Sequence, residues 1–434
     1  MDKNISDVLN KKSMEEIIGK EVEVEGWVHE TRDHGGIRFL ILRDSTGVIQ
    51  ITGKKKDTSK ELFENLKLPK ESVIKVKGVL KEEKQAPRGI ELIPNRIEVL
   101  NEVSILLPVD PTERVVSELD VRLDNRHIDL RRKKVSSIFK IQAEILKAAR
   151  KEFEREGFQE ILPTSIVAAA AEGGTELFPI VYFDKEAFLA QSPQLYKQLA
   201  VIGGIKKAFM IVPYFRAEKH KTTAHLNQSW AIDAEIGFID HHGAMEILER
   251  VFLGILKSIK KNCKEELKEL NINLNVPKKI GKYTYTQAVE MLNEAGHEFE
   301  WGSEIGRDEE RKIQELTKED AYFMTDYPTK IRPFYTMPNK DNPKLCNAFD
   351  LMYMGLEMVS GAQRIHKADL LTEMIKSKGM NPSNFEFYIN AFKSGAPPHA
   401  GWAIGVERLT MAITRQPNVR ECSLFPRDID RITP

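Results

Sequence analysis

Hydrophobic and polar residues alternate in five separated stretches over the first hundred residues. These stretches are KEVEVEGWVHETRD, IRFLILRD, GVIQITG, SVIKVKGVLKEE and IELIPNRIEVLNEV, with Gly, Asp and Lys between them. Alternation with a period of two predicts half-buried strands. The segment TSKELFENLKL, between the third and fourth stretch, has helical spacing. Five strands with a helix at this point favour an OB-type β-barrel over residues 1–104, and a β-sandwich is the alternative.

The pattern changes after residue 104. Residues 105–134 contain LLPVDPTERVVSELDVRLDNRHIDLRRKK, which has two prolines and many arginines. We interpret this stretch as a hinge or linker that packs on another part of the chain. A fully solvated connector is the alternative.

Residues 135–434 mix helical and strand patterns and predict an α+β domain. The segment SSIFKIQAEILKAARKEFEREGF has apolar residues at helical spacing, with Ser136 or Ser137 as the expected N-cap. The strand pattern QEILPTSIV follows, interrupted by Pro163, which suits an edge or interface strand. Residues 241–335 are rich in charge and in helical pattern, and we interpret them as an insertion.

Composition excludes several classes of protein. Lys and Arg together number 65 and so do Asp and Glu, so a nucleic-acid partner would have to meet a local patch and not a basic field. Cys263, Cys346 and Cys422 are far apart without a CxxC, which disfavours a zinc site or a disulfide framework. The N-terminus is too polar for a signal peptide, and no apolar run reaches membrane-spanning length. We expect a cytoplasmic protein without a membrane partner.

A charged hairpin is the first sign of chemistry. PYFRAEKHKTTAHLNQSWAIDAEIGF, residues 213–238, has Arg216 and Glu218 at its entrance and an Asp and a Glu two apart at its exit. A surface hairpin does not need these charges, so we expect them to hold a ligand. GWAIGVERLTMAI reads as a strand entering a helix, with Gly405 and Arg408 at the join. The glycine leaves room for a ligand to approach the backbone, and the arginine beside it can bind a phosphate or stack on an adenine ring.

Two further stretches carry candidate ligands. In NAFDLMYMGLEMVSGAQRIH, Asp350 and Glu357 flank a turn, and such a carboxylate pair suits Mg²⁺, which takes its other ligands from substrate phosphates. A structural ion pair is the alternative. In AEGGTELF, Glu172 lies on a glycine-rich loop that could close on an ammonium group. Gln194 and Lys197 lie on one face of a predicted helix and are candidate ligand-binding residues. The alternative is that this face is simply exposed to solvent.

Taken in order, FRAE, GVER, EGGTELF, QSPQLYKQ, SGAQRIH and LFPRDIDRITP resemble the class II aminoacyl-tRNA synthetases. Among these, the archaeal and eukaryotic-type aspartyl-tRNA synthetases are the most similar, over essentially the whole chain. The resemblance implies an OB barrel that reads the anticodon, a hinge, and an antiparallel catalytic sheet flanked by helices. It also implies a homodimer whose interface uses the helix after Val135 and the strand near Pro163. The reaction implied is activation of L-aspartate by ATP, followed by transfer to the 3′ end of tRNA.

The resemblance also assigns roles in the ATP site. Arg216 would bridge the α-phosphate and the reacting carboxylate, Glu218 would accept from the adenine amino group, and Arg408 would stack on the adenine. His225 would reach the distal phosphates. The other ATP-binding positions implied are Ala217, Ala224, Leu226, Glu357, Gly405, Val406 and Glu407. The positions implied for Mg²⁺ are Asp350, Glu357 and Ser360.

For the amino acid, the resemblance implies that Lys197 and Arg364 receive the side-chain carboxylate and that Gln194 adds a hydrogen bond. Asp233 and Glu172 would hold the α-ammonium or balance the two cations. The positions that complete this site are Arg216 and Ser360. Asparaginyl relatives typically carry an acidic residue where Lys197 stands, so Lys197 favours aspartate, and a lysyl enzyme is disfavoured.

In the barrel, the resemblance implies that Phe39 stacks on an anticodon base while Arg32 and Gln50 bond base edges. From the pattern alone, Phe39 would be a barrel core residue. His29 follows GWV, and Pro87 lies between the last two strand patterns. This combination resembles the non-discriminating type, which charges both tRNA(Asp) and tRNA(Asn).

Three positions depart from the family pattern: Ala171 replaces Thr or Ser, Ala224 replaces Arg, and Gln228 replaces Glu. The alternatives are therefore a discriminating aspartyl enzyme and a paralogue that passes activated aspartate to an acceptor other than tRNA. A non-catalytic tRNA-binding relative is a further alternative. Such a relative should have lost Arg216, Glu218, Arg408 or the Mg²⁺ positions, and all of them are present.

Overall fold

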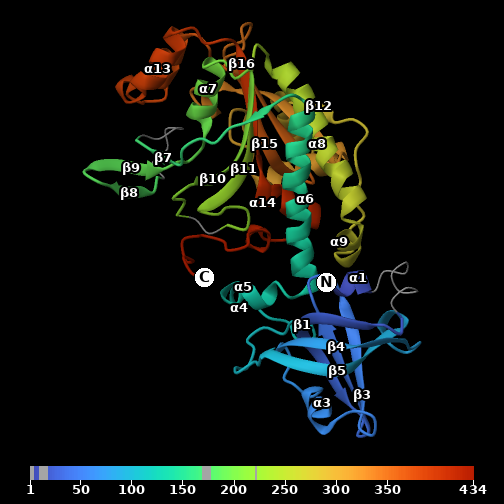
Figure 1. The fold of residues 1–434 in the computed structure, drawn as a ribbon. Coiled ribbons are helices and arrows are strands. Elements are labelled where there is room, and N and C mark those ends of the chain that lie inside the picture. The colour runs from blue at the N-terminus through green and yellow to red at the C-terminus, as the bar shows by residue number, and fades with distance from the viewer. Residues whose placement is uncertain (1–3, 9–17, 169–176, 220–221) are drawn as a thin grey trace. The chain divides into compact units, whose positions relative to one another are not determined.

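The computed structural model describes residues 4–8, 18–168, 177–219 and 222–434. The chain divides into two compact units, Met1–Arg132 and Lys133–Pro434. Figure 1 shows a β-barrel in the first unit and a large sheet covered by helices in the second.

The first unit is built on a closed barrel with the strand order β1-β2-β3-β5-β4. Its strands are β1 Glu21–Asp33, β2 Ile37–Arg43, β3 Val48–Lys54, β4 Val73–Glu82 and β5 Ile90–Asn101. The helix α3, Lys60–Asn65, lies between β3 and β4 and begins where the Ser59 hydroxyl accepts from the Leu62 amide. The OB-fold prediction is therefore confirmed, and the sandwich alternative is wrong.

The arginine-rich stretch after the barrel forms two short helices, α4 Leu119–Asp124 and α5 Arg126–Asp129. Arg126 and Asp129 are both fully buried, and Arg126 Nη1 donates to Asp129 Oδ2 at 2.7 Å. A buried ion pair needs such partners to offset the loss of hydration. This stretch is therefore not a fully solvated connector.

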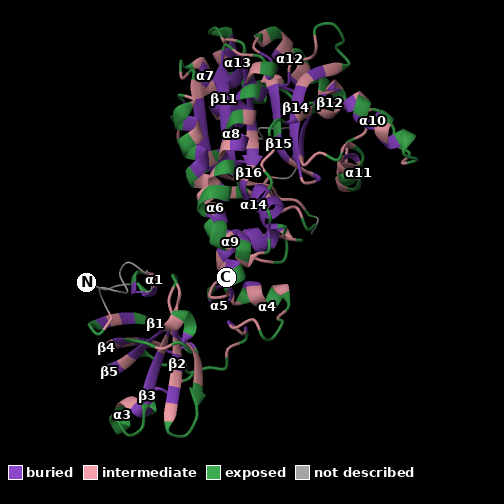
Figure 2. Cartoon of the chain, turned by 90° about the vertical axis from the view of Figure 1, so that its right-hand side faces the viewer, coloured by how far each residue is buried: buried purple, intermediate pink, exposed green. Residues whose placement is uncertain are grey.

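The second unit contains an eight-stranded sheet with the order β12-β13-β14-β15-β16-β11-β10-β6. Its strands are β6 Gln159–Glu160, β10 Lys207–Phe215, β11 Gln228–Gly237, β12 Gly281–Thr284, β13 Ala321–Pro328, β14 Leu345–Tyr353, β15 Leu356–Arg364 and β16 His399–Gly405. A small sheet of β7 Ile166–Val167, β9 Lys185–Leu189 and β8 Pro179–Tyr182 stands beside it. Buried residues are concentrated in the central strands (Figure 2).

Two long helices, α6 Lys133–Arg155 and α8 His241–Asn262, lie side by side against the sheet (Figure 1). The predicted N-cap of α6 is wrong, because the helix already begins at Lys133. The Ser136 and Ser137 hydroxyls instead donate to the Lys133 carbonyl, at 3.0 and 2.8 Å. Serine hydroxyls inside a helix commonly bond to a carbonyl one turn back.

Residues 241–335 are not a separate body, because they cluster with the second unit. Within this stretch α8 contributes many side chains to the main core, and β12 and β13 extend the large sheet at its edge. The remaining helices of the stretch are α9 Lys264–Glu269, α10 Tyr285–Glu294 and α11 Arg307–Thr317. The helices elsewhere in this unit are α7 Gln194–Ile202, α12 Ala368–Ser377, α13 Glu386–Lys393 and α14 Val406–Thr414.

Pro163 lies between two short strands of different sheets, β6 and β7, so the predicted stretch is not one interrupted strand. β6 ends at Glu160 and β7 begins at Ile166, and β6 is the last strand at one edge of the large sheet. Among the helices of the described residues, none combines the length and the apolar character that crossing a membrane requires.

Candidate active site

A polar cleft of about 460 Å³ opens over the central strands of the large sheet. Its walls come from α7, from the β10–β11 hairpin, from β15 and from the join between β16 and α14. It shares lining residues with two smaller cavities, of about 20 and 220 Å³. The three cavities together form one continuous candidate site.

Most of the predicted site residues meet in this cleft. The main cavity is lined by Gln194, Lys197, Arg216, His225, Glu357, Ser360, Arg364, Gly405 and Arg408. The smaller cavities add Glu218, Ala224, Leu226, Glu407 and Asp350. Val406 is buried in the hydrophobic core, and Ala217 is half-buried between Arg216 and Glu218. Glu172 and Ala171 lie outside the described residues.

At one end of the cleft, two cations and two carboxylates are buried together. Lys197 Nζ donates to Asp233 Oδ1 and lies 3.2 Å from Glu235 Oε2. Arg364 donates from Nε and Nη2 to the two oxygens of Glu235, at 3.0 and 3.2 Å. All four side chains are at most 4% exposed. We call this group the charge quartet.

The sheet places the two carboxylates of the quartet. Asp233 and Glu235 alternate with Ala234 along β11, so both project from the same face. Gly401 pairs with Glu235 on the neighbouring strand β16, and a Cβ atom there would lie 2.1 Å from Glu235 Oε2. The glycine therefore makes room for the Glu235 carboxylate.

The two carboxylates differ in how firmly they hold their charge. Burial raises the pKa of Asp233, against the lowering effect of Lys197. Burial also acts on Glu235, but Arg364 and then Lys197 outweigh it and hold the pKa of Glu235 below its usual value. Asp233 is therefore the member that gives up its charge more readily when another carboxylate enters.

Gln194 is held by a chain of buried hydrogen bonds. Its Nε2 donates to Gln198 Oε1 at 2.7 Å, and the Tyr388 hydroxyl donates to the same oxygen at 2.8 Å. Gln198 Nε2 lies 2.8 Å from His399 Nε2, and His399 Nδ1 lies 2.8 Å from the Pro397 carbonyl. Burial lowers the pKa of His399, so its neutral ring donates from Nδ1 and accepts at Nε2. Gln194 and Lys197 are both buried, so the solvated-face alternative is wrong.

The β10–β11 hairpin forms one wall of the cleft. Asn227 ties its two arms together, because its Nδ2 donates to the Arg216 carbonyl at 2.7 Å and to the Glu218 carbonyl at 3.1 Å. The Arg216 guanidinium carbon lies 5.3 Å from the centroid of the Tyr214 ring. Gln228 is the first residue of β11 and pairs with Phe215. Arg216 therefore projects into the cleft from a backbone that is fixed on both sides.

Arg408 crosses to this hairpin from α14. Its Nη2 donates to His225 Nε2 at 3.0 Å, and its Nη1 donates to the Glu357 carbonyl at 3.3 Å. Because arginine only donates, His225 must accept at Nε2 and donate from Nδ1 to the Thr222 hydroxyl, 2.7 Å away. Burial and then Arg408 lower the pKa of His225, which keeps the ring neutral. Beside Arg408, burial raises the pKa of Glu407 to about 7, although the Trp230 amide donates to it at 3.0 Å.

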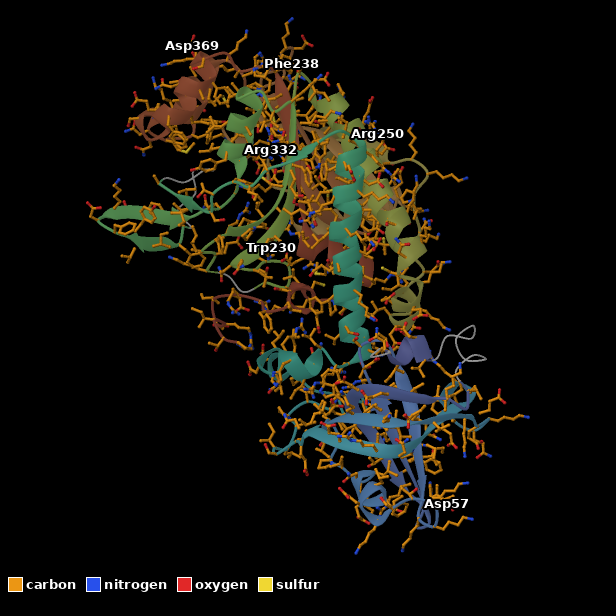
Figure 3. All side chains as sticks on the ribbon, in the orientation of Figure 1. Asp57, Trp230, Phe238, Arg250, Arg332 and Asp369 are labelled. Carbon is orange, nitrogen blue, oxygen red and sulfur yellow. The ribbon has the colours of Figure 1, made fainter. Side chains whose placement is uncertain are left out.

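The predicted magnesium residues face one another across β14 and β15. Asp350 pairs with Ser360, and Glu357 lies nearer the turn. Arg332 (Figure 3) donates to Asp350 Oδ2 and, from Nη1, to Ser360 Oγ at 3.1 Å. Asp350 Oδ1 is buried and has no hydrogen-bond partner among the described residues, and burial and then Asp350 raise the pKa of Glu357.

These oxygens suit a hard divalent cation whose remaining ligands come from a bound nucleotide. The described residues contain no cluster of three or more acidic, histidine or cysteine side chains arranged for a metal. That is compatible with Mg²⁺, which commonly uses one or two protein carboxylates in addition to substrate phosphates. Asp350 also forms an ion pair with Arg332. A structural ion pair was the predicted alternative to metal binding.

The residues predicted to read an anticodon share the outer face of the barrel. Phe39 on β2 pairs with Arg32 on β1, and Gln50 on β3 pairs with Ile41, two positions along from Phe39. Phe39 is half-buried, whereas its neighbour Leu40 lies in the core. Phe39 is therefore not a core residue, and an aromatic ring with polar neighbours on three adjacent strands can stack on and bond to bases.

His29 lies at the bulge of β1, where the register with β2 shifts. Arg43 Nη1 lies 2.9 Å from His29 Nδ1 and Nη2 donates to Glu71 at 2.7 Å, so the histidine borders a buried carboxylate. Pro87 begins the 3₁₀ turn Pro87–Gly89 in the loop between β4 and β5, where the sequence pattern placed it.

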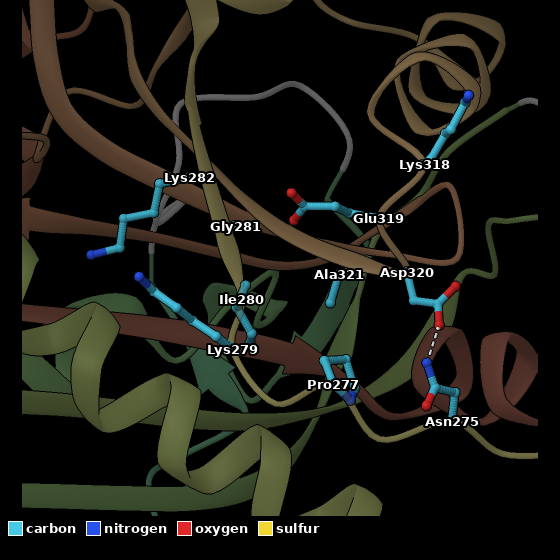
Figure 4. A pocket seen from close by; sticks show the side chains of 10 residues that line it. All are labelled: Asn275, Pro277, Lys279, Ile280, Gly281, Lys282, Lys318, Glu319, Asp320 and Ala321. Carbon is cyan, nitrogen blue, oxygen red and sulfur yellow. Dashed lines mark hydrogen bonds between the residues drawn. The ribbon is translucent and has the colours of Figure 1, made fainter.

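A second cavity, of about 660 Å³, lies at the β12–β13 edge of the sheet (Figure 4). Three lysines and two acidic residues line it, and Asn275 Nδ2 donates to Asp320 at 2.8 Å. It shares no lining residue with the cleft. The predicted chemistry therefore belongs to the smaller and more polar cavity.

Sequence reasoning missed four residues around the cleft. Glu235 had a signal, because it follows Asp233 by two on one strand, but beyond the general expectation of ligand binding it was given no specific role. No sequence signal pointed to Arg332 or to the Gln198–His399 pair. The partner of Arg332 lies 18 positions away, and Gln198 and His399 are 201 positions apart. These contacts exist only once the sheet has assembled.

Comparison with known proteins agrees with this geometry. Residues 22–100 match the OB-fold nucleic acid binding domain, and residues 118–429 match the family described as tRNA synthetases class II (D, K and N). The chain belongs to this family of class II aminoacyl-tRNA synthetases.

Within the family, its relatives include archaeal aspartate enzymes. The aspartate–tRNA(Asp/Asn) ligase of Methanocaldococcus jannaschii is 50% identical over 96% of both chains. The aspartate–tRNA(Asp) ligase of Pyrococcus horikoshii is 47% identical over 97% of this chain and 98% of its own. A crystal structure of Pyrococcus horikoshii asparaginyl-tRNA synthetase with asparaginyl-adenylate superposes with a TM-score of 0.92 at 33% identity, covering 96% and 97% of the two chains. The chain is thus of the archaeal aspartate–tRNA ligase type.

Proposed function

We propose that this enzyme activates L-aspartate with ATP and transfers it to the 3′ end of tRNA(Asp) and tRNA(Asn). The charge quartet is the observation that carries the choice of aspartate. Lys197 and Arg364 line the cleft as buried cations, and Arg364 has three donor hydrogens beyond the two that Glu235 takes. An asparagine amide offers such cations no charge, whereas a carboxylate does.

In this proposal the activation step depends on positioning and electrostatics. Arg216 holds the α-carboxylate of aspartate against the α-phosphate of ATP, and that carboxylate displaces pyrophosphate. Glu218 receives the adenine amino group, and Arg408 covers the adenine ring. No side-chain nucleophile takes part, so the rate enhancement comes from orientation and charge stabilisation.

Glu357 and Ser360, with Asp350, would hold Mg²⁺. When bound, this ion neutralises phosphate charge on ATP. Arg332 holds Asp350 and Ser360 in place from the protein side. In the second step the 3′-terminal ribose hydroxyl attacks the aspartyl carbonyl, and AMP leaves. Residues 105–134 serve in this proposal as the hinge between the anticodon-reading barrel and the catalytic unit.

Relatives of similar identity are named for tRNA(Asp) alone or for both tRNAs, so identity does not decide between them. The proposal that both are charged rests on His29 and Pro87 at the barrel. With both transcripts and labelled aspartate, we expect kcat/KM values for tRNA(Asp) and tRNA(Asn) within about tenfold of each other. His29→Trp should lower charging of tRNA(Asn) and spare tRNA(Asp). Charging of tRNA(Asp) alone by the unaltered enzyme would refute the proposal.

We also propose a homodimer built on α6 and the strand near Pro163. Leu162 next to this proline is 91% exposed, and β6 leaves one edge of the large sheet open. Large exposed apolar side chains at a sheet edge commonly mark an interface. Sedimentation equilibrium should give twice the chain mass of 49.6 kDa, and a monomer at micromolar concentration would contradict the interface.

A further inference from the structure

We propose that Arg307, the first residue of α11, binds the distal phosphates of ATP from outside the hairpin. This inference rests on the proposed function and adds a residue to its ATP site. Arg307 Nη1 donates to the Thr223 hydroxyl at 2.6 Å. Thr223 directly precedes Ala224 and His225, which both line the cavity beside Arg216 and Arg408. The side chain therefore ends at the hairpin, next to two residues that line the small cavity.

The charges around Arg307 indicate an anionic ligand. Burial lowers the pKa of Arg307 most, and Arg311 and Arg408 add to this lowering, whereas Glu310 and Asp308 act against it. Arg307 also contributes, with Arg408 and Arg216, to lowering the pKa of His225. Three guanidinium groups and the Glu218 carboxylate thus act on the charge of one neutral histidine.

Two of these guanidinium groups have neutral hydrogen-bond partners. Arg408 bonds to a backbone carbonyl and to His225, and Arg307 bonds to a hydroxyl. Arg307 Nε is buried without a hydrogen-bond partner among the described residues. A buried donor without a partner is costly, and a polyanion relieves both that cost and the cationic repulsion.

Among the described residues of the hairpin, position 224 does not supply a cation. Ala224 lines the small cavity with Glu218, His225 and Arg408 but offers only a methyl group. Arg307 lies in α11, more than eighty residues further along the chain. Its side chain contacts Thr223, the residue before Ala224. A planar guanidinium there can form two parallel hydrogen bonds to phosphate oxygens.

The test measures aspartate-dependent exchange of pyrophosphate into ATP. Arg307→Ala should raise the KM for ATP about tenfold, as expected for one lost charged contact, and leave the KM for aspartate unchanged. Arg311→Ala removes the same charge one turn further along α11 and should change the KM for ATP less than about twofold. Thr223→Val removes the hydroxyl contact alone and should also have a small effect. The double variant Arg307→Ala with Ala224→Arg should recover most of the lost ATP affinity.

An unchanged KM for ATP in Arg307→Ala would overturn the inference. So would an equal effect of Thr223→Val, which would make Arg307 a brace for the hairpin, or an equal effect of Arg311→Ala. An effect confined to the KM for tRNA would assign Arg307 to a tRNA phosphate instead. Thermal unfolding checks that each variant is folded. Calorimetric binding of a non-hydrolysable ATP analogue tests Arg307 without aspartate, so its outcome is separate from that of the proposed function.

Discussion

Lys197→Glu is expected to abolish aspartate activation, with kcat/KM for aspartate in pyrophosphate exchange falling by at least about 10⁴-fold. The substitution replaces a buried cation beside Asp233 and Glu235 with a third carboxylate. The incoming side-chain carboxylate of aspartate then meets repulsion where it would have found attraction. Arg364 keeps donor hydrogens for the substrate, but Glu235 already balances its charge, so Arg364 does not offset the repulsion from a new carboxylate. This loss should appear in kcat/KM for aspartate, with nucleotide binding retained.

Lys197→Met is the matched control for folding. It removes the charge without adding one, and the raised pKa of Asp233 lets that carboxyl become neutral in the absence of its partner. We expect this variant to unfold at a temperature within a few degrees of the unaltered enzyme and still to lose aspartate activation. Aspartate activation that survives in both variants would show that Lys197 does not select the substrate.

The parts of the fold that follow from local pattern were predictable. The barrel strands alternate with a period of two, and the joins in FRAE, in the β14–β15 turn and in GVER are local in sequence. The backbone conformation at each join is set by residues that are adjacent in sequence. The sequence motif therefore predicts the local geometry. Gln194 and Lys197 meet in the cleft for the same reason, because they lie one helical turn apart on α7.

Contacts that depend on sheet register were not predictable. Glu235 meets Arg364 across 129 positions, and only the order β15-β16-β11 brings them together. Asp350 was expected to bind a metal, yet its partner Arg332 lies before β14 in a segment without a recognisable pattern. The start of α6 was misjudged because a serine hydroxyl serves equally well as a cap or as a donor to an earlier carbonyl.

Arg216→Ala is expected to lower kcat for pyrophosphate exchange about 10³-fold, close to the effect of removing a donor that stabilises developing charge. In the proposed function, Arg216 contacts both the α-phosphate and the attacking carboxylate. Its backbone is fixed by Asn227, so the alanine variant should keep the hairpin intact. The defect should therefore appear in kcat more than in the KM for either substrate.

Arg216→Lys separates geometry from charge. Lysine keeps the positive charge but presents a single ammonium in place of a planar fork, so it cannot bridge two oxygen groups with parallel hydrogen bonds. We expect this variant to recover less than about a tenth of the lost activity. Near-complete recovery would mean that Arg216 contributes only charge to the site. In that case the hairpin would hold the nucleotide, and the alignment of the aspartate carboxylate with the α-phosphate would have to come from the charge quartet alone.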